Sequence, residues 1–204
     1  MLGSLFALLA GCADLSQLLP TRERPVIHDL GPVPVAESVQ SPAPGIVVQM
    51  DSSPWLNNTN VQFRLAYENQ NRLNFYSTAR WVGPPTEMLR ERLAWMMAAH
   101  GQQLVAFSNK GMVYRLNLSL DVFEQEFSAP GKSVAKVQMR GVLIDATSRK
   151  IISQRLVSVA VNAEPSINGA VSGLAAAANG AVKETLDWLA AIPESQITAA
   201  SGRR

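Results

Sequence analysis

The sequence has few of the side chains that form disulfides, metal sites and nucleophile–base pairs. Cys12 is the only cysteine, and His28 and His100 are the only histidines, among 204 residues. A single thiol cannot close an intramolecular disulfide, and neither histidine has a second ligand three or four residues further on, which argues against a zinc site. Ser-His-acid catalysis would need one of these histidines, and the G-x-S-x-G motif of many hydrolases is absent. We therefore expect no metal, no cofactor and no enzymatic activity.

Charge and hydrophobic length argue against several further classes. The formal net charge is +2, which is too small to suggest binding to nucleic acid or to an acidic membrane surface. No apolar run reaches the roughly 18 to 20 residues that a helix needs to cross a bilayer. Glu124 and Glu126 form a candidate acid pair, but their place at the end of a predicted strand favours two solvated side chains over the carboxylates of a glycosidase.

What the sequence does contain is a lipobox-like segment near its start. The short apolar run Leu5-Phe6-Ala7-Leu8-Leu9 is followed by Ala10, Gly11 and Cys12. Two small residues before a cysteine fit the cleft of a signal peptidase, so we predict a signal peptide over residues 1–11 and lipid attachment at Cys12. Two or three acyl chains would hold the mature chain on a bilayer. The alternative is an ordinary buried cysteine. No Lys or Arg precedes the run, although a signal peptide normally begins with positively charged residues. A sequence that starts at an internal Met would explain this difference.

Proline separates a predicted linker from a predicted domain. Six prolines lie between Pro20 and Pro44, and we interpret residues 12–44 as a Pro-rich spacer that contains one short strand, Val26-Ile27-His28-Asp29-Leu30-Gly31. The folded domain is expected over residues 45–192. The polar residues 193–204 are expected to form a disordered tail.

Residue periodicity predicts the elements of this domain. Alternating apolar and polar residues predict strands over 61–67, 73–81, 112–127, 134–145 and 151–161. A β-branched run predicts a strand over 46–50, and a short strand is expected over 104–107. Helical spacing predicts helices over 86–100 and 167–192. The expected fold class is α+β, with a mostly antiparallel sheet and both helices packed on one of its faces.

Each predicted helix has a distinctive face. In the first, Arg90, Glu91 and Arg92 are placed on the solvent side. The second has a buried stripe and a row of small residues that includes Gly169, Gly173 and Gly180. Such a row occurs where membrane helices dimerise, but here it favours close approach of the helix to the sheet.

Two tryptophan-containing segments are candidates for special roles. The corner Arg80-Trp81-Val82-Gly83-Pro84-Pro85 is interpreted as a rigid turn that seats the first helix on the sheet, with partner docking as the alternative. In the loop Pro54-Trp55-Leu56, Trp55 and Leu56 would form a partner contact if both side chains are exposed together, because aromatic residues with apolar neighbours often form the centre of an interface.

These features together resemble the ABC-type transport auxiliary lipoproteins. The resemblance rests on the lipobox ending at Cys12, the segment His28-Asp29-Leu30-Gly31, the strand before Pro54-Trp55-Leu56, the corner from Arg80 to Pro85, and the final Ala-rich helix. It covers the chain from Cys12 to about Ile192. At His28 the family more often has a tyrosine.

The resemblance implies a function in the cell envelope. Members work with an ABC permease and ATPase and with an MCE (mammalian-cell-entry) protein that binds the substrate, in systems that move phospholipids between membranes. Some relatives are thought to form ring-shaped homo-oligomers at the outer membrane. Ala13 after the lipidated cysteine permits export to the outer membrane, whereas Asp14 weakens that assignment.

The first hypothesis is therefore a non-enzymatic lipoprotein on the periplasmic face of the outer membrane that docks an intermembrane lipid transporter. A structural envelope lipoprotein that scaffolds an outer-membrane complex is the second. A lipoprotein hydrolase is the third, and it would need a pocket with converging polar groups.

Overall fold

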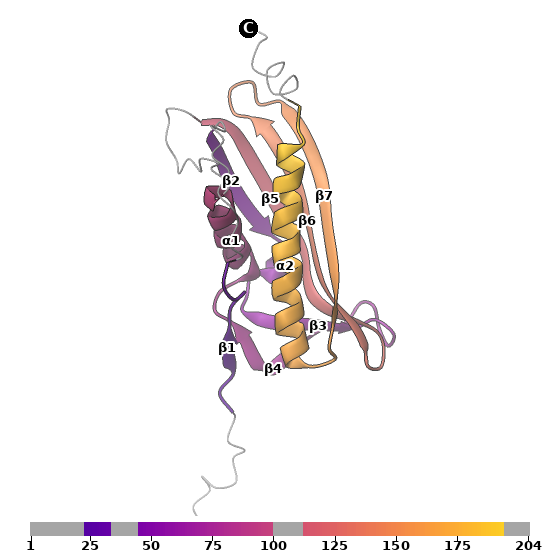
Figure 1. The fold of residues 1–204 in the computed structure, drawn as a ribbon. Coiled ribbons are helices and arrows are strands. Elements are labelled where there is room, and N and C mark those ends of the chain that lie inside the picture. The colour runs from indigo at the N-terminus through magenta and orange to yellow at the C-terminus, as the bar shows by residue number, and fades with distance from the viewer. Residues whose placement is uncertain (1–22, 34–44, 100–111, 194–204) are drawn as a thin grey trace, which may run out of the picture.

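The structure is a computed structural model of the chain, and it describes residues 23–33, 45–99 and 112–193. Figure 1 shows a curved sheet with both helices on one of its faces. Within the described residues, one sheet contains the seven strands β1 (Val26–His28), β2 (Gly45–Ser52), β3 (Asn60–Leu65), β4 (Leu73–Trp81), β5 (Met112–Ala129), β6 (Lys132–Asp145) and β7 (Ile151–Ala163). The same residues form the helices α1 (Pro85–Ala99) and α2 (Ile167–Ala190) and a short 3-10 helix (Pro54–Leu56). The predicted α+β class is confirmed.

β5 is the strand that organises the sheet, because it pairs with three other strands, β2, β3 and β6. β6 follows one edge in antiparallel register for nearly its whole length. The other edge is divided, with β2 parallel to the first half of β5 and β3 parallel to its last residues. Beyond β3 lie β4 and then β1, whereas β7 follows β6 at the opposite edge.

The prediction of a mostly antiparallel sheet is wrong, because the sheet is mixed. The pairs β1–β4, β2–β5 and β3–β5 are parallel, whereas β3–β4, β5–β6 and β6–β7 are antiparallel. The three antiparallel pairs join strands that are consecutive among the described residues. Alternation along one strand shows which face is buried, but it does not show in which direction a distant strand pairs with it.

The folded domain begins before the predicted boundary at Gly45. β1 lies inside the predicted linker, and it pairs in parallel with the end of β4, from Val26 opposite Ala79 to His28 opposite Trp81. Leu30 is 5% exposed and belongs to the hydrophobic core. The prolines do not mark a linker here, because Pro25 and Pro32 flank β1 and neither interrupts its pairing with β4.

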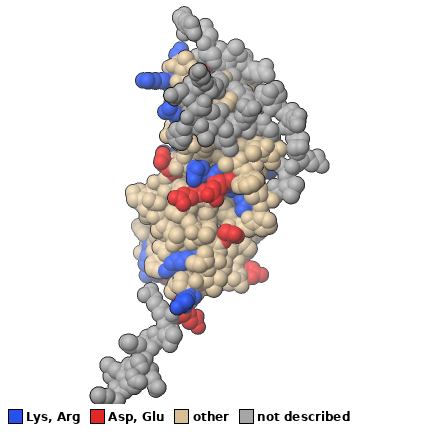
Figure 2. Space-filling view, turned by 90° about the vertical axis from the view of Figure 1, so that its left-hand side faces the viewer, with Lys and Arg blue, Asp and Glu red and all other residues tan. Residues whose placement is uncertain are grey.

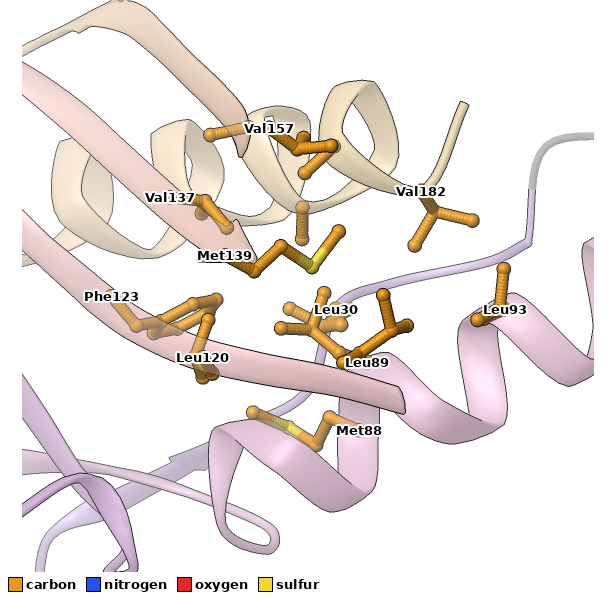
Figure 3. Packing of buried hydrophobic residues seen from close by; sticks show 14 of the residues in the cluster. Leu30, Met88, Leu89, Leu93, Leu120, Phe123, Val137, Met139, Val157 and Val182 are labelled. Atoms are coloured by element: carbon orange, nitrogen blue, oxygen red, sulfur yellow. The ribbon is translucent and has the colours of Figure 1, made fainter. Parts of the chain in front are cut away.

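The core lies between the sheet and the two helices. Figure 3 shows its side chains converging from α1, β5, β6 and α2, with Leu30 among them. The buried stripe predicted for α2 is confirmed, since Leu174, Ala178 and Val182 are fully buried.

Small residues allow α2 to lie close to the sheet, as predicted. A Cβ atom added at Gly173 would stand 2.8 Å from the Cβ atom of Ala135 on β6 and 2.9 Å from that of Ala163 on β7. On β6, a Cβ atom at Gly141 would stand 2.7 Å from the Trp188 ring of α2. Real Cβ atoms do not approach this closely, so both glycines are required by the packing.

Some predictions lie outside the described residues. They are the signal peptide over 1–11, lipid attachment at Cys12, the strand over 104–107 and the tail beyond Pro193.

Candidate functional site

Residues 23–33, which we call the strap, connect the N-terminal part of the chain to the domain. β1 within the strap adds to the edge of β4, and the Val82 N–H donates to the His28 carbonyl at 2.8 Å. After β1 the chain turns at Gly31, which has a φ of 70°, a conformation that glycine adopts without steric cost. The Asp29 carboxylate accepts the Gly31 N–H at 2.7 Å. The strap is thus fixed by the sheet at one end and by a turn at the other.

Arg92 of α1 holds this turn on the domain. Its guanidinium donates to three successive carbonyl oxygens, those of Leu30 at 2.8 Å, Gly31 at 2.6 Å and Pro32 at 2.7 Å. Burial lowers the pKa of Arg92, and the nearby negative charge of Asp29 opposes that shift. The group stays protonated because the ordinary pKa of arginine lies far above neutral pH. One charged side chain therefore satisfies the polar groups of a whole turn.

The prediction that Arg92 faces solvent is wrong, since only 5% of the residue is exposed. The signal that could have placed it is its spacing. Residues 88, 92 and 96 lie one helical turn apart, and the methionines at the first and last of these positions are buried. An arginine within an apolar stripe indicates a specific buried acceptor, here the carbonyls of the strap.

The corner that leads into α1 is largely structural. Trp81 is 1% exposed, and its ring meets Phe123 of β5 edge-to-face with 5.7 Å between ring centres. Its Nε1 donor finds no hydrogen-bond acceptor within the described part of the chain. Val82 is 64% exposed. The rigid-corner interpretation therefore holds for Trp81, and Val82 is the residue that the corner presents to the outside.

The predicted contact pair in the 3-10 helix is divided between surface and core. Trp55 is 59% exposed, whereas Leu56 is 3% exposed and belongs to the hydrophobic core. The Trp55 carbonyl accepts from Asn58 Nδ2 at 2.6 Å and from Gln62 Nε2 at 2.9 Å, so the loop backbone is fixed. The condition that both side chains be exposed together is not met, because the single turn points its two apolar side chains in different directions. Only Trp55 is available as a contact.

A groove of about 470 Å³ lies beside β1. Its apolar lining comes from Ile27 and Val82 on the sheet side and from Val171 and Ala175 on α2. The strap and α2 together therefore form a hollow with a partly apolar surface at the edge of the domain.

The sheet face opposite the helices carries ion pairs rather than an apolar surface. Arg64 of β3 makes a two-pronged contact with Glu124 of β5, at 2.6 and 2.8 Å. This hydrogen bond is the largest contribution to a raised pKa of Arg64, against an opposing effect of burial. Arg140 contacts Asp121 in the same two-pronged manner, with both distances 2.8 Å.

The prediction of two solvated acids is wrong for Glu124, which is 6% exposed and bound to Arg64. Glu126 instead pairs with Lys136 at 3.3 Å. Each carboxylate therefore neutralises a different cation. Among the described residues no group of three His, Cys, Asp or Glu side chains could hold a metal ion. Neither described helix is long and apolar enough to cross a membrane.

The family model described as "ABC-type transport auxiliary lipoprotein component" matches residues 28–187 of the chain. The chain belongs to this family. The match begins at His28, the last residue of β1, so it includes residues 28–33 of the strap, the strands β2 to β7 and most of α2. The resemblance seen in the sequence is confirmed.

Solved structures share the fold at low sequence identity. A crystal structure of a Xanthomonas campestris protein of the DUF330 family has a TM-score of 0.65 and 16% identity, over 80% of this chain and 94% of that one. A second crystal structure, of an uncharacterized protein, has a TM-score of 0.60 and 14% identity, over 84% of this chain and all of that one. No curated protein matches the sequence.

Proposed function

We propose that the protein is a non-enzymatic, lipid-anchored accessory of an ABC transport system in the cell envelope. The observation that carries the proposal is the family match, because it spans nearly the whole domain and includes the turn after β1 that Arg92 holds. In this proposal Cys12 carries the acyl chains. The strap connects the anchored N-terminal segment to the domain, because β1 pairs with the sheet and Arg92 binds the turn that follows.

The finer assignment is an intermembrane lipid transporter. We propose that the protein sits on the periplasmic face of the outer membrane and docks an MCE-domain protein, which works with a permease and an ATPase. The family description supports an ABC transport partner, and the MCE protein and the outer membrane follow from the sequence resemblance. We also propose association of several copies in a ring, which sedimentation of the lipidated chain in detergent would test.

The contact with the transporter is proposed to include Trp55. A tryptophan that is 59% exposed in a loop with a fixed backbone offers a large apolar area at a low cost in conformational entropy. Trp95 on α1 provides a matched control, because it is the same residue type and is 67% exposed.

Co-purification from native membranes tests the proposal. The lipidated wild type is expected to recover the MCE protein and the permease, Trp55→Ala to recover clearly less of both, and Trp95→Ala as much as the wild type. Equal recovery by all three would remove Trp55 from the contact. Recovery of outer-membrane assembly proteins in place of any transporter subunit would overturn the transport assignment in favour of a structural scaffold.

A further inference from the structure

Four exposed apolar side chains surround the place where the strap joins the sheet. Val26 and Ile27 of β1, Phe75 of β4 and Val82 after β4 are 60%, 59%, 54% and 64% exposed, and we call these four residues the edge patch. Ile27 and Val82 line the same groove beside β1. Ile27 pairs in register with Arg80, and the Arg80 guanidinium lies 5.6 Å from the centre of the Phe75 ring.

The position of Arg80 is fixed, so the patch has a defined rim. Its Nη1 donates to the carbonyls of Tyr76 at 2.8 Å and Ala79 at 2.7 Å. Held in this way, the guanidinium covers one side of the Phe75 ring, in a cation–π contact. Arg24 precedes β1 and is exposed. The patch therefore combines aliphatic and aromatic area with two arginines at its border.

Charge is distributed unevenly on this side of the molecule. Figure 2 shows acidic and basic side chains gathered in the middle of the face, and single charged side chains of both signs spaced over the uncharged surface below. The exposed charged residues of α1 are Glu87, Arg90 and Glu91. Single exposed apolar residues are ordinary on protein surfaces, whereas a connected group with a polar border indicates a contact surface.

The chain that precedes the strap identifies what this surface contacts. If Cys12 is acylated, residues 13–22 separate it from Glu23. A fully extended chain spans at most about 3.5 Å per residue, so Glu23 lies within about 40 Å of the leaflet that holds the acyl chains. Because β1 pairing and Arg92 fix the strap to the domain, the edge patch is the part of the sheet that lies closest along the chain to the anchor.

We propose that the edge patch rests on the lipid leaflet in which the acyl chains of the same molecule are inserted. Ile27, Phe75 and Val82 lie at the boundary between headgroups and acyl chains, and Arg24 and Arg80 face the headgroups. Side chains of these types favour that boundary. The inference rests on the proposed function, because it requires acylation of Cys12.

Tethering makes a small patch sufficient for this contact. A short flexible link raises the effective concentration of the tethered surface to about the millimolar range, so a contact too weak for a free protein is occupied in the anchored one. The orientation that results directs β7, at the other edge of the sheet, away from the leaflet. The patch would thus set the direction in which the domain presents its remaining surface.

Site-specific fluorescence on the anchored chain tests this orientation. The sequence has one cysteine, and acylation consumes it, so Ile27→Cys provides a single thiol for an environment-sensitive NBD label. Val82→Cys tests a second position outside β1, in case the strand does not tolerate the label. Leu156→Cys on β7 is the matched control, because Leu156 is 56% exposed at the opposite edge of the sheet. Each lipidated full chain is placed in vesicles of phosphatidylethanolamine with a minority of phosphatidylglycerol and nitroxide-labelled lipid.

The expected result is a blue shift of NBD emission and several-fold stronger quenching by the nitroxide lipid at positions 27 and 82 than at position 156. Equal, weak quenching at all three positions would overturn the proposal. So would protection of positions 27 and 82 only after the transporter protein is added, since the patch would then be a protein contact. Failure of acylation is distinguishable, because the mass spectrum would show a second label at Cys12 and no acyl chains.

Discussion

The meander formed by β5, β6 and β7 and the strap that contains β1 both belong to one sheet, but they are held in it by different contacts. β5, β6 and β7 follow each other through short turns and pair continuously in antiparallel register. The strap reaches the sheet through three residues of β1, which pair with the distant strand β4, and through the hydrogen bonds of Arg92. Attachment of the meander is distributed over many contacts, whereas that of the strap depends on a few. The strap should therefore be released by a change that leaves the meander intact.

Phe123→Ala should produce the largest effect, because this residue joins the two regions. Phe123 is 1% exposed and packs against Trp81 at the end of β4, next to β1. Loss of a buried phenylalanine side chain should lower the free energy of unfolding by about 4 kcal/mol. Urea unfolding followed by circular dichroism measures this loss. Phe75→Ala, at a residue 54% exposed, is the control and should have a small effect. Similar losses for both variants would contradict the assigned core.

Arg92→Ala should separate the two regions. Removal of the guanidinium leaves three carbonyls of the strap without their donor, and the expected loss of stability is about 3 kcal/mol. Hydrogen exchange should show faster exchange over residues 26–33 and little change in β6 and β7. Arg90→Ala, at an exposed position of the same helix, should leave both regions unchanged. A uniform rise in exchange throughout the sheet would show that the strap does not open independently.

Glu124→Ala should affect the polar face of the sheet more than Asp121→Ala does. The Arg64 side chain is only 23% exposed, so without Glu124 its charge loses its partner in a partly buried site, at a cost of about 2 kcal/mol. The Arg140 side chain is 64% exposed, and water replaces Asp121 as its partner. Thermal unfolding of the two variants measures the difference. Equal shifts in Tm would mean that burial does not distinguish these pairs.

Gly173→Ala should have the smallest effect, because two contributions oppose each other. Alanine favours a helix over glycine by about 1 kcal/mol, but the new methyl group would meet the Cβ atoms of Ala135 and Ala163. Overpacking should win, with a net loss of about 1 kcal/mol. Gly180→Ala is the control, since the new atom meets only Val159, and its nearest contact is a methyl group at 3.1 Å. Chemical denaturation in which Gly173→Ala is the more stable variant would contradict the close helix–sheet packing.

The same comparison explains which features the sequence could predict. The meander and α2 were predictable because their signals are local: alternation along each strand, turns between neighbours, and the apolar stripe that contains Leu174 and Val182. The sequence predicts a short strand at β1, but the parallel pairing of β1 with β4 joins residues that are far apart in the sequence. No local pattern encodes such a pairing, so the start of the domain was placed too late.

At the candidate site, residue type alone did not predict which side chains are exposed and which are buried. The sequence places Arg92 and Glu124 in solvent and makes a contact at Leu56 conditional on its exposure, yet all three residues are buried. Arg92 and Glu124 are buried because a partner distant in the sequence satisfies their charge, and Leu56 because a 3-10 turn directs it into the core.

The central claim is that the N-terminal segment holds this domain on a membrane through an acylated cysteine. Intact mass spectrometry of the native protein, purified from the membrane fraction, tests that claim most directly. The account predicts a chain that begins at Cys12 and carries the added mass of a diacylglyceryl group, with or without a further acyl chain. A soluble chain that retains the residues before Cys12 and has a free thiol would contradict it.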